Sequence, residues 1–597
     1  MNLSPEEKTI GRDNYYDALE VSRRDFFKEV IGAGVASTAT LGAMYFGYGR
    51  VDNPVRVGVI GTGDEGNVLL GAMNPNYLQV VAISDIRPSS IHRAFHGDWA
   101  SEAAIAARPG LMKVYGWKTE DEARTHVKVY ERYEELLADD QIEAVVIALP
   151  LHLHAPAAIL AMKHGKHVLT EKLMAHNIAQ CKLMGRVATE KNLYLATGHQ
   201  RHYNVLYDNA VNLLRWGVLG EVHYIRAQWH RGNLPGRDSW ALPIPGGEKG
   251  TDLSGKERTL DPISSQLKEL EKDLKSSTSP VARELLQKKI AQWKAWNDDR
   301  RIAADQFGYE ERTLPNGRLR TAMEELVRWR LWERTGGGLM AELGSHQLDA
   351  ATIFINALRA DGKHVHPLTV HAVGGRHTFP LDRDSFDHVY CTFEFPGPGY
   401  DPKFPVGYYD PASVYPDPKI GVPSFDQDEN KKIVVTYSSI NGNGFGGYGE
   451  VVMGTRGTLV LERELETMLY KDSSVSTRVG VRQDGGGPTL DTQASGDGGP
   501  LAKAAEGKPV SRGYREQLEH WAWCIRNQAP ENRPKCHPEV AIGDAVIATT
   551  ARVAMSNAQK NVGGYLPFQA DWFDMNHDAT PDGSNISDER TKLDAAS

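Results

Sequence analysis

Three groups of residues in this 597-residue chain have types and spacings that could do chemistry, and the first is a glycine-rich turn. The segment Gly61-Thr62-Gly63-Asp64-Glu65-Gly66 follows an apolar run and precedes a helical pattern that starts near Asn67. Glycines at this spacing permit a tight turn, close approach of a pyrophosphate and helix–strand packing, while helix N–H groups receive the phosphate charge. The pattern predicts dinucleotide binding, with an ordinary strand–helix turn as the alternative.

An acidic residue follows the next apolar run of the chain. Asp85 comes directly after Leu78–Ser84, where a carboxylate can hydrogen-bond an unphosphorylated ribose and would repel a 2′-phosphate. This position favours NAD over NADP. Arg87 keeps NADP open as the alternative, because an arginine there could pair with that phosphate.

The other two groups carry ionisable side chains. Glu171-Lys172 follows the apolar run His167–Thr170, and Glu342 lies four residues before His346 in a helical pattern. Residues at that spacing share one helix face, so both could point at one substrate. Taken alone, His346 would be read as a packed helix histidine. His152 and His154 lack a third ligand placed by the sequence, so we expect no catalytic metal.

The elements that must position these groups form two patterns. Val55–Ile60, Leu78–Ser84 and Ala144–Leu149 are β-branched runs typical of buried parallel strands, and helical stretches such as Tyr133–Asp139 lie between them. This alternation predicts a doubly wound α/β domain over residues 54–197.

Residues 198–575 predict an α+β domain with a large, mostly antiparallel open sheet. A helix is expected over Asn204–Trp216, and further helical blocks over Gln517–Arg526 and Glu539–Ala558. The expected strands are Glu221–Trp229, Leu368–Val373, His388–Phe395, Lys432–Ser439 and Gly457–Glu462. Pro396–Pro423 and Asp484–Pro500 are predicted loops, and the polar tail 576–597 is expected to be poorly ordered.

A long insertion, from about 238 to 334, interrupts this second domain. Ile263–Lys275 and Val281–Asn297 place apolar residues at helical spacing, which predicts an amphipathic helix pair used as a packing or oligomer surface. Four tryptophans flank the insertion and are candidates either for stacking on sugar rings or for core positions: Trp229, Trp240, Trp329 and Trp332.

The N-terminal residues 1–53 look like a twin-arginine export signal with its linker. Ser22-Arg23-Arg24-Asp25-Phe26-Phe27-Lys28 leads into the apolar, Gly- and Ala-rich stretch Val30–Tyr48. We therefore expect a periplasmic or exported protein, with an ordinary amphipathic helix as the alternative reading. The apolar stretch is long enough for the signal to be retained as a membrane anchor.

Two further motifs complete a family pattern. Leu149-Pro150-Leu151-His152-Leu153-His154 follows the third strand, and Gly336-Gly337-Gly338-Leu339-Met340-Ala341-Glu342-Leu343-Gly344-Ser345-His346-Gln347-Leu348-Asp349 lies far along the chain. With the glycine turn and the Glu-Lys pair, these resemble the Gfo/Idh/MocA oxidoreductases in order and spacing. The resemblance runs from Val55 to about Lys560, insertion excluded, and implies a Rossmann domain plus a C-terminal sheet domain.

The resemblance implies hydride transfer between NAD(P) and a sugar, glycoside or polyol. Lys172 would stabilise the developing alkoxide beside the nicotinamide, His346 would be the acid/base residue, and Glu342 stands where the family has aspartate. The residues implied at the cofactor are Gly61, Thr62, Gly63, Glu65, Gly66, Asp85, Arg87, Leu149, His154, Glu171 and Lys172. Those implied at the substrate are His199, Arg201, His346 and Asp349. For His199 and Arg201, a polar contact between the domains is an equally good interpretation.

One departure from the family concerns the backbone. Leu173 stands where the family has a proline that is often cis, and a cis bond before leucine is costly, so we expect the local backbone to differ. Export of the folded protein implies tightly held NAD, because a dissociable cofactor would be lost outside the cytoplasm. Family members also pair through the open face of the sheet, which implies a homo-oligomer.

Two other functions remain open at this stage. An NAD-dependent glycoside hydrolase would oxidise C3 transiently, eliminate the aglycone, add water and reduce the ketone again. A non-enzymatic binding protein would keep the fold without the chemistry. The net charge of −9 gives no basic field for nucleic acid, and the four cysteines, without metal or disulfide spacing, are expected to be buried.

Overall fold

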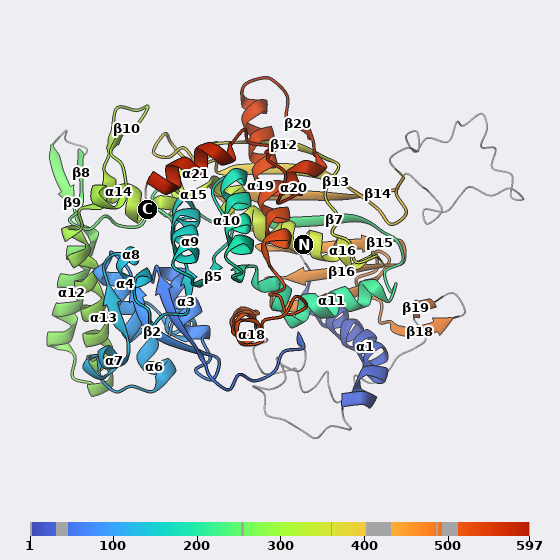
Figure 1. Cartoon of the computed structure of the whole chain (residues 1–597), viewed down its shortest axis with the longest axis horizontal. Helices are drawn as coiled ribbons and strands as arrows, with labels where there is room; N and C mark the ends of the chain where they lie inside the picture. The colour runs from blue at the N-terminus through green and yellow to red at the C-terminus, as the bar shows by residue number, and fades with distance from the viewer. Residues whose placement is uncertain are drawn as a thin grey trace, which may run out of the picture.

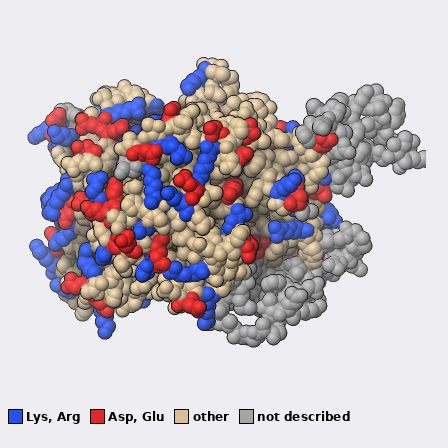
Figure 2. Space-filling model, viewed as in Figure 1, with Lys and Arg blue, Asp and Glu red and all other residues tan. Residues whose placement is uncertain are grey.

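The computed structural model describes residues 3–30, 46–251, 256–359, 361–401, 431–484, 487–491 and 511–595. Its two large sheets, of six and eight strands, lie side by side (Figure 1). The expected loops in 396–423 and 484–500, and the apolar stretch after Val30, lie mainly outside the described residues. Lysine, arginine and acidic side chains are interspersed on the face shown in Figure 2.

The first sheet is parallel throughout and has the order β3-β2-β1-β4-β5-β6. Its chain order reverses between β1 and β4, and α/β folds bind ligands at such a switch point, outside the carboxyl ends of the strands. The strands are β1 Val55–Ile60, β2 Leu78–Ser84, β3 Lys128–Tyr130, β4 Ala144–Ile147, β5 His167–Thr170 and β6 Leu195–Thr197. The predicted doubly wound domain is confirmed.

Helices cover both faces of this sheet. Most of their inward positions are apolar, and they bury β4 and β5 completely and most of β1 and β2. They are α3 Asp64–Ala72, α4 Pro88–His96, α5 Glu102–Ala107, α6 Leu111–Tyr115, α7 Glu120–His126, α8 Tyr133–Leu137, α9 His154–Lys163 and α10 Ile178–Glu190. The helix after the glycine turn begins at Asp64, three residues before the expected start at Asn67.

The second sheet is mixed, with order β17-β16-β15-β7-β14-β13-β12-β20, and only the β7–β14 pair is parallel. Its strands are β7 Val222–Trp229, β12 Thr369–Gly375, β13 His388–Pro396, β14 Lys432–Ile440, β15 Tyr448–Gly454, β16 Gly457–Glu462, β17 Glu466–Lys471 and β20 Tyr565–Pro567. Alternating burial along β13 and β14 fits a sheet with one covered face. The predicted α+β domain with an open, mostly antiparallel sheet is confirmed.

Helices of the C-terminal region pack on both domains. The long ones are α11 Val205–Arg215, α16 Ser345–Ala357, α18 Tyr514–Arg526 and α19 Pro538–Gln559, and a short α20 spans Ala570–Phe573. Helix α16 crosses β7, β14 and β15, and α19 lies along β12. Helix α18 instead buries Leu518 and Trp521 in the core around β1 and β2. This segment of the predicted second domain thus completes the first.

The insertion forms the predicted helix pair, α12 Pro262–Ser276 and α13 Pro280–Asp298. Each begins at a proline after a capping side chain: Asp261 accepts from Ser264 N, and Ser279 from Ala282 N. Helix α13 packs against α4 of the parallel-sheet domain (Figure 1). The short elements of the insertion are β8 Glu248–Thr251, β9 Glu257–Leu260, β10 Arg312–Thr313, β11 Leu319–Arg320, α14 Ala322–Val327 and α15 Glu333–Gly336.

The N-terminal helix α1, Pro5–Val30, lies on β17 and contains the Arg-Arg pair. Asn14 is buried there, donates to the carbonyls of Leu469 and Thr477, and accepts from Val479 N. Tyr15 is also buried. Among the described residues, no helix is both long and apolar enough to cross a membrane.

The C-terminal tail corrects one expectation. Residues Ile586–Ala595 form helix α21, which packs on α10 and buries Ile586 and Leu593. Gln180 donates to the Glu589 carboxylate across this contact. The polar composition of the tail hid these two apolar anchors, so the expected disorder is wrong.

Candidate active site

A cavity of about 670 Å³ lies between the parallel sheet, the second domain and the insertion. Its volume is in the range of small-molecule and cofactor sites. It is lined by the ends of β1, β2, β4 and β5, as the switch-point rule requires. Of the predicted site residues, eleven line it: Gly61, Gly63, Glu65, Asp85, Arg87, Leu149, His154, Glu171, Lys172, Glu342 and His346.

The three glycines of the turn have distinct roles. Gly61 has φ +87°, and a Cβ there would lie 2.5 Å from Ala148 O. A Cβ on Gly63 would meet nothing within 4 Å, so the backbone is open to a ligand, whereas one on Gly66 would meet Gly61 O. The free N–H groups at the start of α3 then face the cavity end where a pyrophosphate binds in such turns. Thr62 and Gly66 shape the turn without lining the cavity.

Asp85 braces the same turn from the end of β2. Its Oδ2 accepts from Thr62 N at 2.7 Å, and its Oδ1 accepts from Arg87 N at 2.8 Å. Arg87 turns its Nε to the Asp299 carboxylate of the insertion, at 2.9 Å. The Asp85 carboxylate therefore faces the cavity beside an arginine whose charge is already compensated.

Lys172 joins the two domains. Its Nζ donates to Glu342 O at 2.7 Å and to Ala341 O at 3.1 Å. Both carbonyls belong to a π-helical turn, Met340–Gly344, that leads into α16, and such turns recur at functional sites. An ammonium has three N–H donors, so one is left for a ligand in the cavity.

The peptide between Lys172 and Leu173 is cis. The expectation that the backbone would differ here, because leucine replaces proline, is therefore wrong. His154 braces the segment: its Nδ1 lies 2.8 Å from Leu173 O and its Nε2 lies 2.9 Å from Leu149 O. Burial lowers the pKa of His154 to about 4, so the imidazole is neutral.

Glu342 is an ionised partner of Arg330. Arg330 Nε donates to its Oε1 at 2.6 Å. Burial alone would raise the pKa of Glu342, but the charges of Arg330 and Lys172 outweigh it and lower the pKa to about 2. The carboxylate therefore stays charged across the physiological range and orients Arg330, which also lines the cavity.

His346 lies on α16, one turn beyond Glu342, with its ring 5.5 Å from the ring of Trp229. Burial, and then the charge of Lys172, lower its pKa well below the usual value. The imidazole is neutral at pH 7 and can accept a proton from a ligand hydroxyl.

Two carboxylates, the buried Glu171 and the partly buried Glu65, lie beside Lys172. Burial raises the pKa of both, and the charge of Glu65 raises that of Glu171 further. Tyr514 donates a hydrogen bond to Glu65. Like charges this close favour retention of a proton by the pair at neutral pH.

Three predicted substrate residues lie behind the cavity wall. His199 is 1% exposed, with Nε2 2.8 Å from Asp544 Oδ2 and Nδ1 3.2 Å from Cys536 Sγ. Arg201 is equally buried, donates to Glu464 and Glu450, and binds the backbone carbonyl of His346. Asp349 is paired with His202. These geometries argue against direct contact with a sugar; Arg201 instead positions the His346 backbone.

Other lining residues were missed or left open by the sequence. Trp229 and Trp329 line the cavity, whereas Trp240 and Trp332 are core residues. Arg231 also lines it, stacked over Trp229 and Trp240. Arg512 and Tyr514 reach it from the start of α18. They stand outside any recognisable motif, so only the fold brings them together. All four cysteines are buried, as expected.

Comparison with known proteins gives the family. Residues 55–199 match a family model described as GFO_IDH_MocA, an oxidoreductase family with an NAD-binding Rossmann fold. The parallel-sheet domain of this chain thus matches the Gfo/Idh/MocA oxidoreductases, the family that the motifs resemble.

Individual relatives match over part of their length. An uncharacterized oxidoreductase of Schizosaccharomyces pombe is 35% identical over 152 residues, 24% of this chain and 41% of the relative. A 1-carboxy-3-chloro-3,4-dihydroxycyclohexa-1,5-diene dehydrogenase of Comamonas testosteroni is 28% identical over 202 residues, which are 34% of this chain and 43% of the relative. A glycosyl hydrolase family 109 protein of Solibacter usitatus is 28% identical over 214 residues, which are 34% of this chain and 44% of the relative. The chain thus spans under half the length of each.

Among solved structures, an aldose-aldose oxidoreductase from Caulobacter crescentus aligns with 15% identity and a TM-score of 0.46, covering 86% of this chain and 100% of that one. A levoglucosan dehydrogenase in complex with NADH and levoglucosan aligns with 14% identity and a TM-score of 0.44, covering 86% and 99%.

The neutral state of His346 predicts a pH effect on stability. An unfolded histidine takes up a proton as pH falls through about 6.5, whereas the folded one stays neutral, so folding loses stability as pH falls below that value. We expect His346→Gln to lose less unfolding free energy than the wild type between pH 7 and pH 5, measured by denaturant titration. His223→Gln, at an exposed position of β7, is the control. Parallel pH dependences of His346→Gln and wild type would contradict the assignment.

Proposed function

We propose that the protein is an NAD-dependent oxidoreductase that moves a hydride between the nicotinamide and a carbon bearing a hydroxyl in a sugar, glycoside or polyol. One observation carries the proposal: Lys172, with a free N–H, and the neutral His346 face the cavity that begins at the glycine turn. A donor and a proton acceptor are what alcohol oxidation requires.

Each side chain at the cavity has a separate role in the proposed hydride transfer. A bound nicotinamide supplies a hydride acceptor. Lys172 donates its remaining N–H to the reacting oxygen and stabilises the negative charge that develops there. His346 accepts the hydroxyl proton at a ring nitrogen and returns it in the reverse direction. Glu342 holds Arg330 in the wall of the cavity, where the guanidinium can bind a further hydroxyl.

The turn and its surroundings fit NAD. The open space over Gly63 admits a pyrophosphate, and the Asp85 carboxylate at the cavity wall suits two ribose hydroxyls. NADP fits less well, because Asp85 would repel a 2′-phosphate and Arg87 is neutralised by the buried Asp299. We infer that NAD is the cofactor and that it is held tightly.

A second candidate is an NAD-dependent glycoside hydrolase. The family 109 relative favours it, and the same hydride site would serve transient oxidation at C3. Release of an aglycone without net change of the nicotinamide would distinguish it from a dehydrogenase. A binding protein without chemistry is disfavoured, because Gly61, Gly63, Lys172 and His346 all retain their positions at the cavity.

We also propose that the protein is exported by the twin-arginine route and keeps its leader. The residues before the Arg-Arg pair pack on β17 through Asn14 and Tyr15, so removal of the leader would uncover a buried edge. A homo-oligomer through the open sheet face is a further proposal, supported by the exposed Val373, Tyr390 and Tyr565 on adjacent strands.

Replacement of Lys172 tests the central role. We expect Lys172→Met to slow reduction of bound NAD by a panel of sugars and polyols by about 10²- to 10⁴-fold, because the alkoxide loses its donor. Nucleotide content per chain should stay near that of the wild type. Lys191→Met, an exposed lysine of the same domain, should react normally. A wild-type rate in Lys172→Met would remove Lys172 from the mechanism.

Replacement of Asp299 tests the choice of cofactor. Asp299→Asn removes the charge that holds Arg87, so Arg87 becomes available to a 2′-phosphate. We expect the ratio of NADP affinity to NAD affinity, measured by calorimetry on nucleotide-free protein, to rise roughly tenfold, which corresponds to about 1.4 kcal/mol. Asp298→Asn, the partly exposed neighbour, is the control. An unchanged ratio would mean that Arg87 does not govern the preference.

Retention of the leader predicts the mass of the exported protein. After expression in a bacterium with a twin-arginine pathway and cell fractionation, we expect the chain outside the cytoplasm to have the mass of the full 597-residue sequence. Cleaving it would leave Val479 N and the carbonyls of Leu469 and Thr477 without Asn14. A mass lacking the first helix would refute retention, and a chain confined to the cytoplasm would refute export.

A further inference from the structure

We propose that residues 262–309 of the insertion form a clamp over the adenosine half of the dinucleotide and keep it from exchanging between turnovers. The inference rests on the proposed function and gives the insertion a role in it. The sequence predicted only a packing or oligomer surface here. In the structure α13 of the helix pair lies against α4, beside the end of β2, where Asp85 marks the place of the adenosine ribose.

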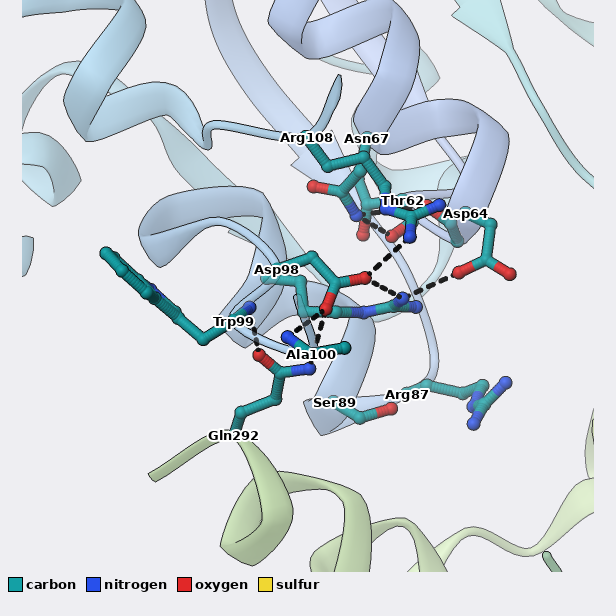
Figure 3. A network of polar contacts seen from close by, with 12 residues as sticks. Thr62, Asp64, Asn67, Arg87, Ser89, Asp98, Trp99, Ala100, Arg108 and Gln292 are labelled. Atoms are coloured by element: carbon teal, nitrogen blue, oxygen red, sulfur yellow. Dashed lines mark hydrogen bonds and ion pairs between the residues drawn. The ribbon is translucent and has the colours of Figure 1, made fainter. Parts of the chain in front are cut away.

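The clamp is tied to the Rossmann domain by a side-chain amide. Gln292 of α13 donates from Nε2 to Asp98 Oδ1 at 2.9 Å and accepts at Oε1 from Trp99 N at 2.7 Å (Figure 3). One turn earlier, Lys288 Nζ lies 4.2 Å from the centre of a Trp99 ring, a cation–π contact. An amide that uses both its donor and its acceptor in this way fixes the register of α13 on the segment after α4.

This contact continues into the glycine turn. Asp98 also accepts from Arg93 Nη1 at 3.4 Å, and Arg93 Nη1 donates to Asp64 Oδ1 at 2.6 Å (Figure 3). Asp64 is the first residue of α3, next to Gly63. The side chains of Asp98, Arg93 and Asp64 thus link the insertion to the turn that would hold the pyrophosphate.

A second tie lies at the N-terminus of α4. Asp299 is 0% exposed, and its carboxylate accepts from Ser89 N at 2.9 Å, from Ser89 Oγ at 2.6 Å and from Arg87 Nε at 2.9 Å. The insertion thereby supplies an anionic partner to the first turn of a Rossmann helix. Moving the clamp away would leave the buried Asp299 carboxylate without these hydrogen-bond donors, which costs free energy.

The clamp also contributes the wall of the cavity. Five of its residues line it: Gln292, Trp296, Gln306, Phe307 and Tyr309. Trp296, Phe307 and Tyr309 thus give this part of the wall three aromatic side chains. Tyr309 lies near Asp85, and aromatic rings in this wall suit an adenine base, which offers a flat face for stacking.

Exchange of bound nucleotide tests the clamp. Protein carrying NAD is mixed with excess isotope-labelled NAD, and the label bound per chain is followed by mass spectrometry. We expect slow exchange in the wild type and exchange faster by about tenfold in Gln292→Ala, which loses both hydrogen bonds of the tie, and in Trp296→Phe, which shrinks an aromatic ring of the cavity wall. Gln287→Ala, an exposed glutamine on the same helix, should exchange like the wild type. The unfolding midpoints of all variants serve as the check on folding.

The outcomes separate the two proposals. If the wild type carries no nucleotide and binds none when supplied, the oxidoreductase assignment fails. If NAD binds but Gln292→Ala and Trp296→Phe exchange it no faster than Gln287→Ala, the clamp is overturned while the oxidoreductase assignment stands. The clamp is also overturned if the wild type exchanges NAD as fast as Gln292→Ala does.

Discussion

The site depends on one interaction, the bond between the Lys172 ammonium and the carbonyls of Ala341 and Glu342. Lys172 follows a strand of the parallel sheet, and the two carbonyls belong to the π-helical turn that opens α16 in the second domain. The bond therefore fixes the distance between the glycine turn and His346. The same turn presents Glu342 to Arg330. It therefore sets the positions of the base His346, the donor Lys172 and the arginine of the cavity wall together.

Burial decides the charge state of each group around this bond. The imidazole of His346 is neutral because burial and nearby cations lower its pKa, while Glu342 is ionised because Arg330 and Lys172 outweigh burial. Glu171 shows the opposite outcome. Burial and the charge of Glu65 raise its pKa, which leaves a proton near Lys172. Neighbouring groups with divergent pKa values are typical of sites for proton transfer.

The local parts of the account were predictable from the sequence, and the long-range parts were not. Strands β1 and β2 match their predicted bounds, and the glycine spacing defined the turn, because both depend on residues next to each other. His199 and Arg201 were placed at the substrate by their position after the Rossmann domain, whereas Asp544, Glu450 and Glu464, far along the chain, hold them in the wall. Gln292 and Asp299 carry no motif, so their contacts with Asp98 and Arg87 arise only from how the insertion folds back.

The central claim is that this fold holds NAD as the partner of Lys172 and His346. The most direct measurement is to purify the protein without added nucleotide, denature it, and quantify by mass spectrometry what each chain releases. We expect close to one NAD or NADH per chain. Release of NADP would contradict the argument from Asp85 and Arg87, and no nucleotide, with no binding when NAD is supplied, would contradict the claim itself.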